Sequence, residues 1–456
     1  MLLSKYCVIV PDYPYKGQHV VFHTGTQALV LLDSQALSYL KNEIRLNTLP
    51  PKKQIEYQKM LPELRQMGIL VKDQQEDAAY LESFFDQLKR QRIRKTWPVT
   101  ILTTDACNFQ CVYCFEENAR RNIAMNLEVQ TDTLAFIKNR MTSDKYERLY
   151  VTFYGGEPLL KPAVITHLAS NLKNWSKKAG VVFEFMLQTN GYLLSPNLVR
   201  SLIPLGLDQV RVSLDGPRDV HDARRPLRSG GRTFDTIIKN ILASMDSIKI
   251  CVSVCYEKDH LQDIDALLSF LKQKNMLHQL GRFIFSPIHP RLGTPEDKNR
   301  IQHFDCMINY QDANLVQSIS VIRDILKTYD VDDSRKGLAI SACPLMREKG
   351  GLTIDPCGYI YKCNSMIGFS KFSVGQVKDA QFNPRADYFV SLDPWRSCPN
   401  DCPYLPLCGG GCRMSAYFKY KDFKELDCHR DYLDQMIPVF IKEEYTRLTT
   451  EKQYSS

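Results

Sequence analysis

Apolar residues follow two different spacings along the chain, and the most regular alternation lies between Pro98 and Pro290. Helical spacing of apolar residues predicts helices there at 131–140, 163–178 and 234–245. Short runs rich in β-branched and aromatic residues predict six strands, at 99–104, 149–156, 183–191, 209–216, 248–257 and 282–288. This alternation is typical of an α/β fold with a parallel sheet and helices on its outer face. We expect a partial barrel with its active site at the carboxyl ends of the strands.

The first 93 residues follow a different pattern. Short apolar runs separated by turn residues predict strands at 6–10, 19–23 and 28–32, with a further strand at 69–71. Helical patterns occupy 34–45, 52–67 and 78–89. We therefore predict a small α+β domain over 1–93, ahead of the central domain over 94–290.

The rest of the chain is less periodic. Residues 291–340 are polar and mainly helical in pattern, which predicts a bridge. The stretch 341–432 is rich in Cys, Gly and Pro and has no long periodic segment, so it needs something other than a hydrophobic core, and bound metal can serve. A last helix is predicted at 431–448, and the C-terminal segment that holds most of it is predicted at 433–456.

Composition excludes several classes of protein. At about 150 residues per domain, 456 residues correspond to about three domains. Hydrophobic residues make up 44% and charged residues 24%, which excludes a disordered or fibrous chain. The net charge of +8 is mild for this size, so we expect no nucleic-acid partner. No apolar run approaches the ~18 residues that cross a bilayer. The apolar run at the N-terminus, which ends before Pro11, is too short for a signal peptide. We therefore expect a cytoplasmic protein without a membrane partner.

The 15 cysteines change this picture because a reducing cytosol argues against a disulfide framework. Clustered cysteines there are metal ligands or catalytic groups more often than disulfides. One cluster consists of Cys107, Cys111 and Cys114, and eight more cysteines lie in the last quarter of the chain. Four stand apart and are interpreted as small buried hydrophobes: Cys7, Cys251, Cys255 and Cys306.

The first cluster lies directly after the first predicted strand of the central domain. Three residues separate Cys107 from Cys111, and two separate Cys111 from Cys114. A loop this short can wrap three thiolates around one face of a cube-shaped iron–sulfur cluster. Three ligands are one too few for four irons, so one iron is left open for a substrate or cosubstrate, as at a catalytic zinc. A structural zinc site or a chance spacing is the alternative.

This spacing after a first strand resembles that of the radical S-adenosylmethionine (radical SAM) enzymes. The resemblance implies a partial (β/α)6 TIM-like barrel of the radical SAM type, in which the amino and carboxylate groups of SAM chelate the open iron. It also implies that one electron cleaves SAM to methionine and a 5′-deoxyadenosyl radical, which abstracts a hydrogen atom. An electron donor such as flavodoxin or ferredoxin is then required.

Further motifs end the next strands in the order that the family has. They are YGGEP (154–158), QTNG (188–191), SLDGP (213–217) and, after these, HDARRP (221–226). By the resemblance, GGEP holds the SAM amino group, SLDGP contacts the ribose and the arginine meets the carboxylate. The residues so implied to bind SAM are Tyr113, Gly155, Gly156, Glu157, Asn190, Ser213 and Arg225, with Ile288 beside the adenine. No catalytic side chain is assigned.

The later cysteines resemble the SPASM extension of radical SAM peptide-modifying enzymes, which carries two auxiliary 4Fe–4S clusters and makes three clusters in all. By the resemblance, Cys343, Cys363 and Cys412 hold the first auxiliary cluster. The second is held by Cys398, Cys402, Cys408 and Cys428. Cys357 is a candidate fourth ligand of the first; otherwise that iron is open to a substrate. Three residues, rather than the family's usual two, separate Cys398 from Cys402. A pair of zinc ribbons is the alternative.

Three functions remain open at this point. The first is a maturase that crosslinks or epimerises a ribosomally made precursor peptide, and the second is an anaerobic sulfatase maturase that makes formylglycine. The third is a non-catalytic metal-binding module. Asn364 favours the first over the second, because sulfatase maturases have an aspartate there as proposed base. The 1–93 domain resembles a winged-helix-like peptide-recognition element, which binds a leader peptide at a sheet edge and which we expect to fold alone.

Overall fold

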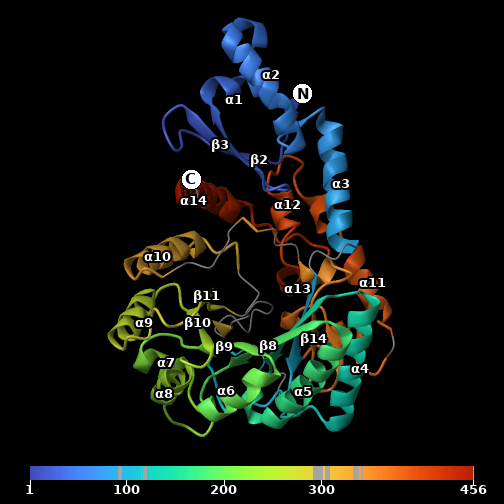
Figure 1. Cartoon of the computed structure of the whole chain (residues 1–456), viewed down its shortest axis with the longest axis vertical. Helices are drawn as coiled ribbons and strands as arrows, with labels where there is room; N and C mark the ends of the chain where they lie inside the picture. Colours follow the sequence, from blue (N-terminus) through green and yellow to red (C-terminus); the bar gives the residue numbers. More distant parts are fainter. Residues whose placement is uncertain are drawn as a thin grey trace.

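The computed structural model describes most of the chain, and Figure 1 shows its arrangement. The described residues are 1–90, 95–114, 116, 121–290, 301–302, 309–331, 338–339, 343–379 and 381–454. The barrel lies at one end of the molecule, the small N-terminal unit at the other, and the cysteine-rich C-terminal region between them (Figure 1).

Six parallel strands form the barrel, and they are neighbours in chain order, as predicted. They are β6 (Thr96–Leu102), β7 (Arg148–Tyr154), β8 (Val182–Thr189), β9 (Leu207–Ser213), β10 (Lys249–Tyr256) and β11 (Phe283–Pro287). The helices on the outer face are α4 (Leu127–Ser143), α5 (Pro162–Ala179), α6 (Pro196–Leu202), α7 (Arg218–Arg224), α8 (Phe234–Ser244) and α9 (Gln262–Gln273). Both faces of the strands are apolar because helices and the barrel interior cover them. The predicted fold class is confirmed.

The sheet does not stop at the barrel. β14 (Leu352–Ile354) pairs in parallel with β6, so that Leu352 lies opposite Val99 and Ile354 opposite Ile101. Two antiparallel strands follow, β15 (Tyr359–Tyr361) and β16 (Gly375–Gln376), and they complete a nine-stranded sheet. One sheet therefore joins the predicted 94–290 and 341–432 units, whose boundaries stay predictions.

The C-terminal region is otherwise made of short helices. They are α11 (Pro384–Ser391), α12 (Leu405–Cys408) and α13 (Arg413–Tyr420), followed by the long α14 (Arg430–Tyr454). Most of the predicted bridge lies outside the described residues; its described elements are α10 (Leu315–Thr328) and β13 (Ile301–Gln302), which pairs with β12 (His289–Pro290). Within the described ranges, none of the helices combines the length and the apolar character that spanning a lipid bilayer requires.

The N-terminal unit has a three-stranded antiparallel sheet in the order β2 (Cys7–Val10), β3 (Gln18–His23), β4 (Leu29–Asp33). A second pair joins β1 (Leu2–Leu3) to β5 (Leu70–Val71), and the helices are α1 (Ser34–Leu40), α2 (Pro51–Gln66) and α3 (Gln74–Arg90). The helix predicted at 34–45 is longer than the observed α1, which ends at Leu40. Asp33 caps α1 by accepting from the amide of Ala36, and the chain leaves the helix before Asn42, whose φ is +62°.

Both faces of this small sheet are covered. Val21 and Leu32 pack with α1 and α2 on one face. On the other face, Val8, Val20 and Phe22 belong to one apolar cluster with residues of α14. A separate 1–93 fragment would expose that second face to water, which counts against the expectation that the unit folds alone.

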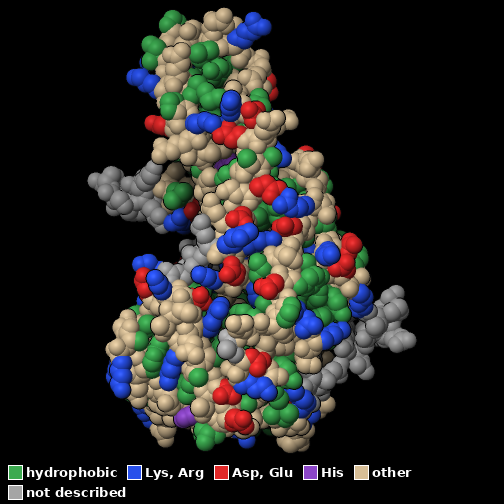
Figure 2. All heavy atoms as spheres, turned by 90° about the vertical axis from the view of Figure 1, so that its right-hand side faces the viewer, with side chains coloured by type: hydrophobic (Ala, Val, Ile, Leu, Met, Phe, Trp, Pro, Cys, Tyr) green, Lys and Arg blue, Asp and Glu red, His purple; other side chains and the backbone are tan. Residues whose placement is uncertain are grey.

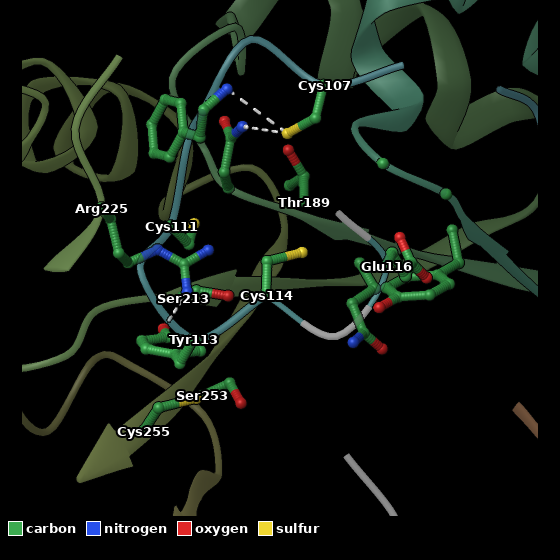
Figure 3. Close-up of a pocket in the computed structure, with 16 residues that line it drawn as sticks. Cys107, Cys111, Tyr113, Cys114, Glu116, Thr189, Ser213, Arg225, Ser253 and Cys255 are labelled. Carbon is green, nitrogen blue, oxygen red and sulfur yellow. Dashed lines mark hydrogen bonds between the residues drawn. The ribbon is translucent and has the colours of Figure 1, made fainter. Parts of the chain in front are cut away.

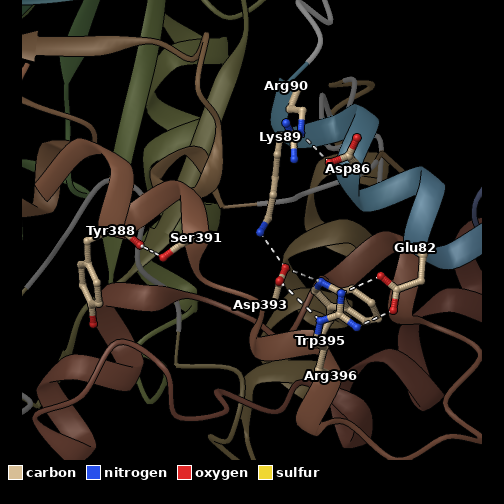
Figure 4. Close-up of polar contacts among 9 residues, drawn as sticks. All are labelled: Glu82, Asp86, Lys89, Arg90, Tyr388, Ser391, Asp393, Trp395 and Arg396. Atoms are coloured by element: carbon tan, nitrogen blue, oxygen red, sulfur yellow. Dashed lines mark hydrogen bonds and ion pairs between the residues drawn. The ribbon is translucent and has the colours of Figure 1, made fainter. Parts of the chain in front are cut away.

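Helix α3 is tied to the C-terminal region by ring stacking and by ion pairs, and Figure 4 shows the ion pairs. The rings of Phe85 and Trp395 stack with centroids 4.8 Å apart. Lys89 Nζ lies 2.6 Å from Asp393 Oδ1, and the Arg396 guanidinium pairs with the carboxylate of Glu82. The ring contact is buried and carries more of the stabilisation, because exposed ion pairs contribute at most about 1 kcal/mol each.

The surface seen in Figure 2 carries Lys and Arg side chains interspersed with Asp and Glu. Neither sign of charge dominates this face, in keeping with the mild net charge.

The contact between α14 and the N-terminal sheet leads to a testable prediction. Ile437 is fully buried in α14, whereas Val439, two residues on, is 40% exposed. Ile437→Ala should lower the free energy of opening of β2 and β3 by about 2–4 kcal/mol, because it leaves a cavity against them. Hydrogen exchange of their amides measures this loss. Val439→Ala is the matched control, and equal exchange in both variants would contradict the packing described.

Candidate active site

A pocket opens at the carboxyl ends of β6 to β10, where a parallel barrel has its active site. Figure 3 shows that the sulfur atoms of Cys107 and Cys114 point toward one central space, with Arg225 approaching from a neighbouring side. Of the residues predicted to bind the cluster or SAM, the pocket lining includes Cys107, Cys111, Tyr113, Cys114, Gly155, Gly156, Asn190, Ser213 and Arg225. Ile288 is buried outside this lining.

The two glycines of the GGEP motif are required by a close backbone approach. A Cβ on Gly155 would lie 2.2 Å from the carbonyl oxygen of Thr104, and one on Gly156 would lie 2.3 Å from that of Ala106. The amide of Gly156 donates to Thr104 O at 3.0 Å, and the amide of Glu157 donates to Ala106 O at 2.8 Å. The glycines therefore hold the end of β7 against the residues that lead into Cys107, besides lining the pocket.

Glu157 is placed differently from the prediction. Its carboxylate is fully buried and lies outside the pocket lining. Oε1 accepts from Thr189 Oγ1 at 2.7 Å and from the Leu159 amide at 2.9 Å, while Oε2 accepts from the Asn190 amide at 2.8 Å. Burial raises the pKa of this carboxyl group. Glu157 thus ties the end of β7 to the end of β8, because its oxygens are used by protein donors rather than by a bound ammonium group.

Asn190 lies at that junction and faces the cysteine loop. Its Nδ2 donates to Asn108 Oδ1 at 2.8 Å and lies 4.0 Å from the sulfur of Cys107. The amide of Phe109 donates to the same sulfur at 3.4 Å. Polar N–H groups therefore face this sulfur, and hydrogen bonds of this kind stabilise a thiolate when it binds metal.

Two buried side chains, Tyr113 and Asp215, hold Arg225 in place, and only the first was predicted to belong to the site. Its Nη1 donates to the hydroxyl of Tyr113 at 2.6 Å and lies 3.6 Å from Asp215 Oδ2. Tyr113 in turn donates to the Asp215 carboxylate, whose Oδ1 accepts from the Cys255 amide. Burial raises the pKa of Tyr113 well above its usual range, so the phenol remains a donor. Asp215 was missed, although it stands inside the SLDGP motif.

One hydrogen-bond donor of Arg225 indicates that a ligand binds here. Its Nε is buried and has no hydrogen-bond partner among the described groups. A buried guanidinium donor without a partner costs about 1–3 kcal/mol or more, which a bound carboxylate would recover. The residues present therefore fit the carboxylate of SAM.

The pocket lining also includes residues that were not predicted as site residues. Ser253 and Cys255 lie at the end of β10, and Gln188 and Thr189 at the end of β8. Cys255 is buried, as interpreted, but its place in the lining makes it more than a core residue. Its position at the end of the fifth strand was the signal that could have identified it.

Residues 101–271 match the radical SAM superfamily. The chain contains a radical SAM domain. It is 21% identical over 373 residues to the cysteine-type anaerobic sulfatase-maturating enzyme of Clostridium perfringens (strain 13 / Type A), with 77% of this chain and 97% of that protein covered. A radical SAM domain implies one 4Fe–4S cluster and SAM, which the pocket residues fit.

Two solved structures have a similar fold. Native anSMEcpe with bound AdoMet and Cp18Cys peptide has a TM-score of 0.59 at 17% identity, covering 77% of this chain and 99% of that one. Streptococcus suis SuiB bound to precursor peptide SuiA has a TM-score of 0.53 at 14% identity, covering 94% of this chain and 98% of that one. At these identities the likeness establishes the radical SAM fold.

A second cavity, of about 360 Å³, lies between β6, β14 and α13. Its lining includes Cys343, Cys363 and Cys412, the three residues predicted for the first auxiliary cluster, together with Cys408. Asn364 lines the same cavity, and its Oδ1 accepts from the hydroxyl of Thr353.

The second predicted group of cysteines is also brought together. Burial, together with the neighbouring Cys402 and Cys428, raises the pKa of Cys398 to about 11. Burial likewise raises the pKa of Cys408 to about 12, with Cys398, Cys402 and Cys428 as its interacting thiols. Cys408 thus stands between this group and the second cavity.

No three His, Cys, Asp or Glu side chains in the described ranges are grouped closely enough to hold a single metal ion. Ligands of a 4Fe–4S cluster stand further apart, since each thiolate binds a different iron.

The buried arginine leads to a prediction about SAM binding. Arg225→Ala should weaken SAM affinity by about tenfold to a hundredfold, because it removes a charge-assisted contact. Titration of the iron-loaded protein with SAM measures the change, and iron content should stay the same because Arg225 is not a cluster ligand. Arg232→Ala, at an exposed arginine, is the matched control. Unchanged affinity in Arg225→Ala would mean that the carboxylate binds elsewhere.

Proposed function

We propose that this enzyme cleaves SAM in the pocket at the ends of β6 to β10 and modifies a ribosomally made precursor peptide. The observation that carries the proposal is the meeting of three loop thiols and a buried arginine with an unpartnered Nε in one pocket. When bound, the cluster and SAM supply the electron transfer and the 5′-deoxyadenosyl radical that abstracts hydrogen. The electron donor, flavodoxin or ferredoxin, stays a prediction.

Each residue of the pocket has a separate task in this proposal. Cys107, Cys111 and Cys114 would hold the cluster, and Arg225 would bind the SAM carboxylate. Tyr113 and Asp215 would act indirectly: their hydrogen bonds orient the Arg225 guanidinium. Glu157 holds the end of β8 in place, and through it Asn190.

We further propose two auxiliary 4Fe–4S clusters. Cys343, Cys363 and Cys412 would hold the first, because they line one cavity. The second would be held by Cys398, Cys402, Cys408 and Cys428, whose thiols interact with one another. Cys357 lies outside the cavity of the first group.

The N-terminal sheet supports a peptide substrate. β4 is an edge strand, and two hydrogen bonds flank its pairing with β3: the Ser34 amide donates to Gly17 O at one end, and the His23 amide donates to Ala28 O at the other. In this register the even-numbered residues of β4 bond to β3, so Leu29 and Leu31 turn their N–H and C=O groups away from the sheet. Leu31 is 40% exposed. A leader peptide can add as a strand at this edge.

A sulfatase-maturase function is the second candidate, because the chain covers 97% of the related maturase. Asn364 is the observation against it. Its amide cannot accept a proton at neutral pH, whereas an aspartate at this place could. The larger share of this chain that SuiB covers, 94% against 77%, also favours a protein with an additional unit.

Iron content tests the assignment of the three clusters. Changing Cys107, Cys111 and Cys114 together to Ala should lower bound iron from about twelve to about eight per chain, given four irons per cluster. SAM cleavage under a strong reductant should disappear at the same time. Cys251→Ser, at a buried cysteine outside the three groups, should change neither quantity. Iron that falls to zero in the triple variant, or cleavage that survives, would defeat the assignment.

A backbone substitution at the sheet edge tests the substrate. Leu31→Pro removes an N–H that points away from β3 and keeps the hydrogen bonds within the sheet. It should abolish modification of a precursor peptide that the wild-type enzyme modifies, while SAM cleavage continues; Leu31→Ala, which keeps the N–H, should remain active. Mass spectrometry of the peptide measures both. Formylglycine formed on a cysteine-containing sulfatase peptide would instead favour the second candidate.

A further inference from the structure

Among the described residues, four cysteines line the second cavity, and one of them, Cys408, is assigned to the other group. Cys343, Cys363 and Cys412 line it, while Cys408 interacts with the thiols of the other group. Cys357, the candidate fourth ligand, lies in a different environment. Its amide donates to Asp355 Oδ1 at 2.8 Å, and its thiol faces Arg121, which pairs with Asp105 near the start of the first cysteine loop.

His429 lines the cavity instead. Its Nε2 lies 2.9 Å from Asp427 Oδ2, and its ring packs against Tyr310 with centroids 4.0 Å apart. Asp427 is almost completely buried and also accepts from the amide of Cys412 at 3.2 Å and from Lys419 Nζ at 2.9 Å. One carboxylate therefore fixes both the imidazole of His429 and the backbone of a cluster cysteine. Nδ1 is the ring nitrogen that Asp427 does not engage.

Lys362 and Asn364, two further polar side chains of the cavity, already have protein partners. Lys362 Nζ donates to Arg347 O at 2.7 Å, and Asn364 Oδ1 accepts from Thr353. A histidine held by a carboxylate through one ring nitrogen is the arrangement that proteins use to orient a metal-ligating imidazole. The chemistry of the donors in this cavity thus favours His429 over its neighbours.

We propose that His429, through Nδ1, is the fourth ligand of the auxiliary cluster held by Cys343, Cys363 and Cys412. The inference rests on the auxiliary clusters of the proposed function. A neutral imidazole in place of a thiolate makes the cluster less negative, so it accepts an electron more readily than an all-cysteine cluster. Asp427 is a positioning residue for this ligand, and Cys357 is not a ligand.

Pulsed electron paramagnetic resonance of the full chain tests the ligand directly. The iron-loaded protein is prepared with isotopically labelled histidine and reduced with dithionite in the absence of SAM. We expect a hyperfine coupling between a reduced cluster and histidine nitrogen. Because no histidine is among the described residues that line the active-site pocket, such a coupling reports on an auxiliary cluster.

Two variants complete the test. His429→Cys should keep about twelve irons per chain, lose the nitrogen coupling and lower the midpoint potential, because it supplies a thiolate at the same place. Cys357→Ala should retain both the iron and the coupling. Absence of the coupling from the iron-loaded wild-type chain, its survival in His429→Cys, or loss of about four irons in Cys357→Ala would each overturn the inference. A chain that binds no iron would contradict the proposed function itself.

Discussion

The active site depends on how closely the ends of two neighbouring strands approach each other. The end of β7 lies so close to the residues before Cys107 that no side chain fits at Gly155 or Gly156. Backbone hydrogen bonds across this contact fix the start of the cysteine loop, and the buried carboxylate of Glu157 extends the same fixation to β8. Because the loop is short, fixing its start restricts the positions of all three thiols. The cysteine spacing alone would not do this.

Much of the barrel could be predicted because buried parallel strands appear as short apolar runs, and all six were found to within a few residues. The pairing of β14 with β6 could not be predicted. These strands are three and seven residues long and lie some 250 positions apart, and nothing local in either sequence specifies the partner. The end of α1 was also missed, because the left-handed conformation of Asn42 is set by its surroundings rather than by apolar spacing.

The sequence motifs correctly located the strand ends that form the site. They predicted the role of each side chain less well. Nine of the predicted residues meet in one pocket, yet the carboxylate of Glu157 turns away from it and Asp215 stands behind Arg225. Sequence shows that a residue follows a strand, whereas the direction of its side chain depends on which donors the neighbouring strand presents. The same limit applied to Cys357, whose thiol faces Arg121 rather than the cavity expected from its position in the chain.

The pairing of β14 with β6 also bears on how such enzymes can diversify. A domain attached by a flexible linker can be exchanged between genes with little regard for its neighbour. Here the C-terminal region supplies a strand to the barrel's own sheet, and its cavity is lined by Pro98 and Thr100 of β6. An exchanged C-terminal region would have to bring a strand that matches this edge in register and side-chain volume. Barrel and C-terminal region are therefore expected to be inherited together.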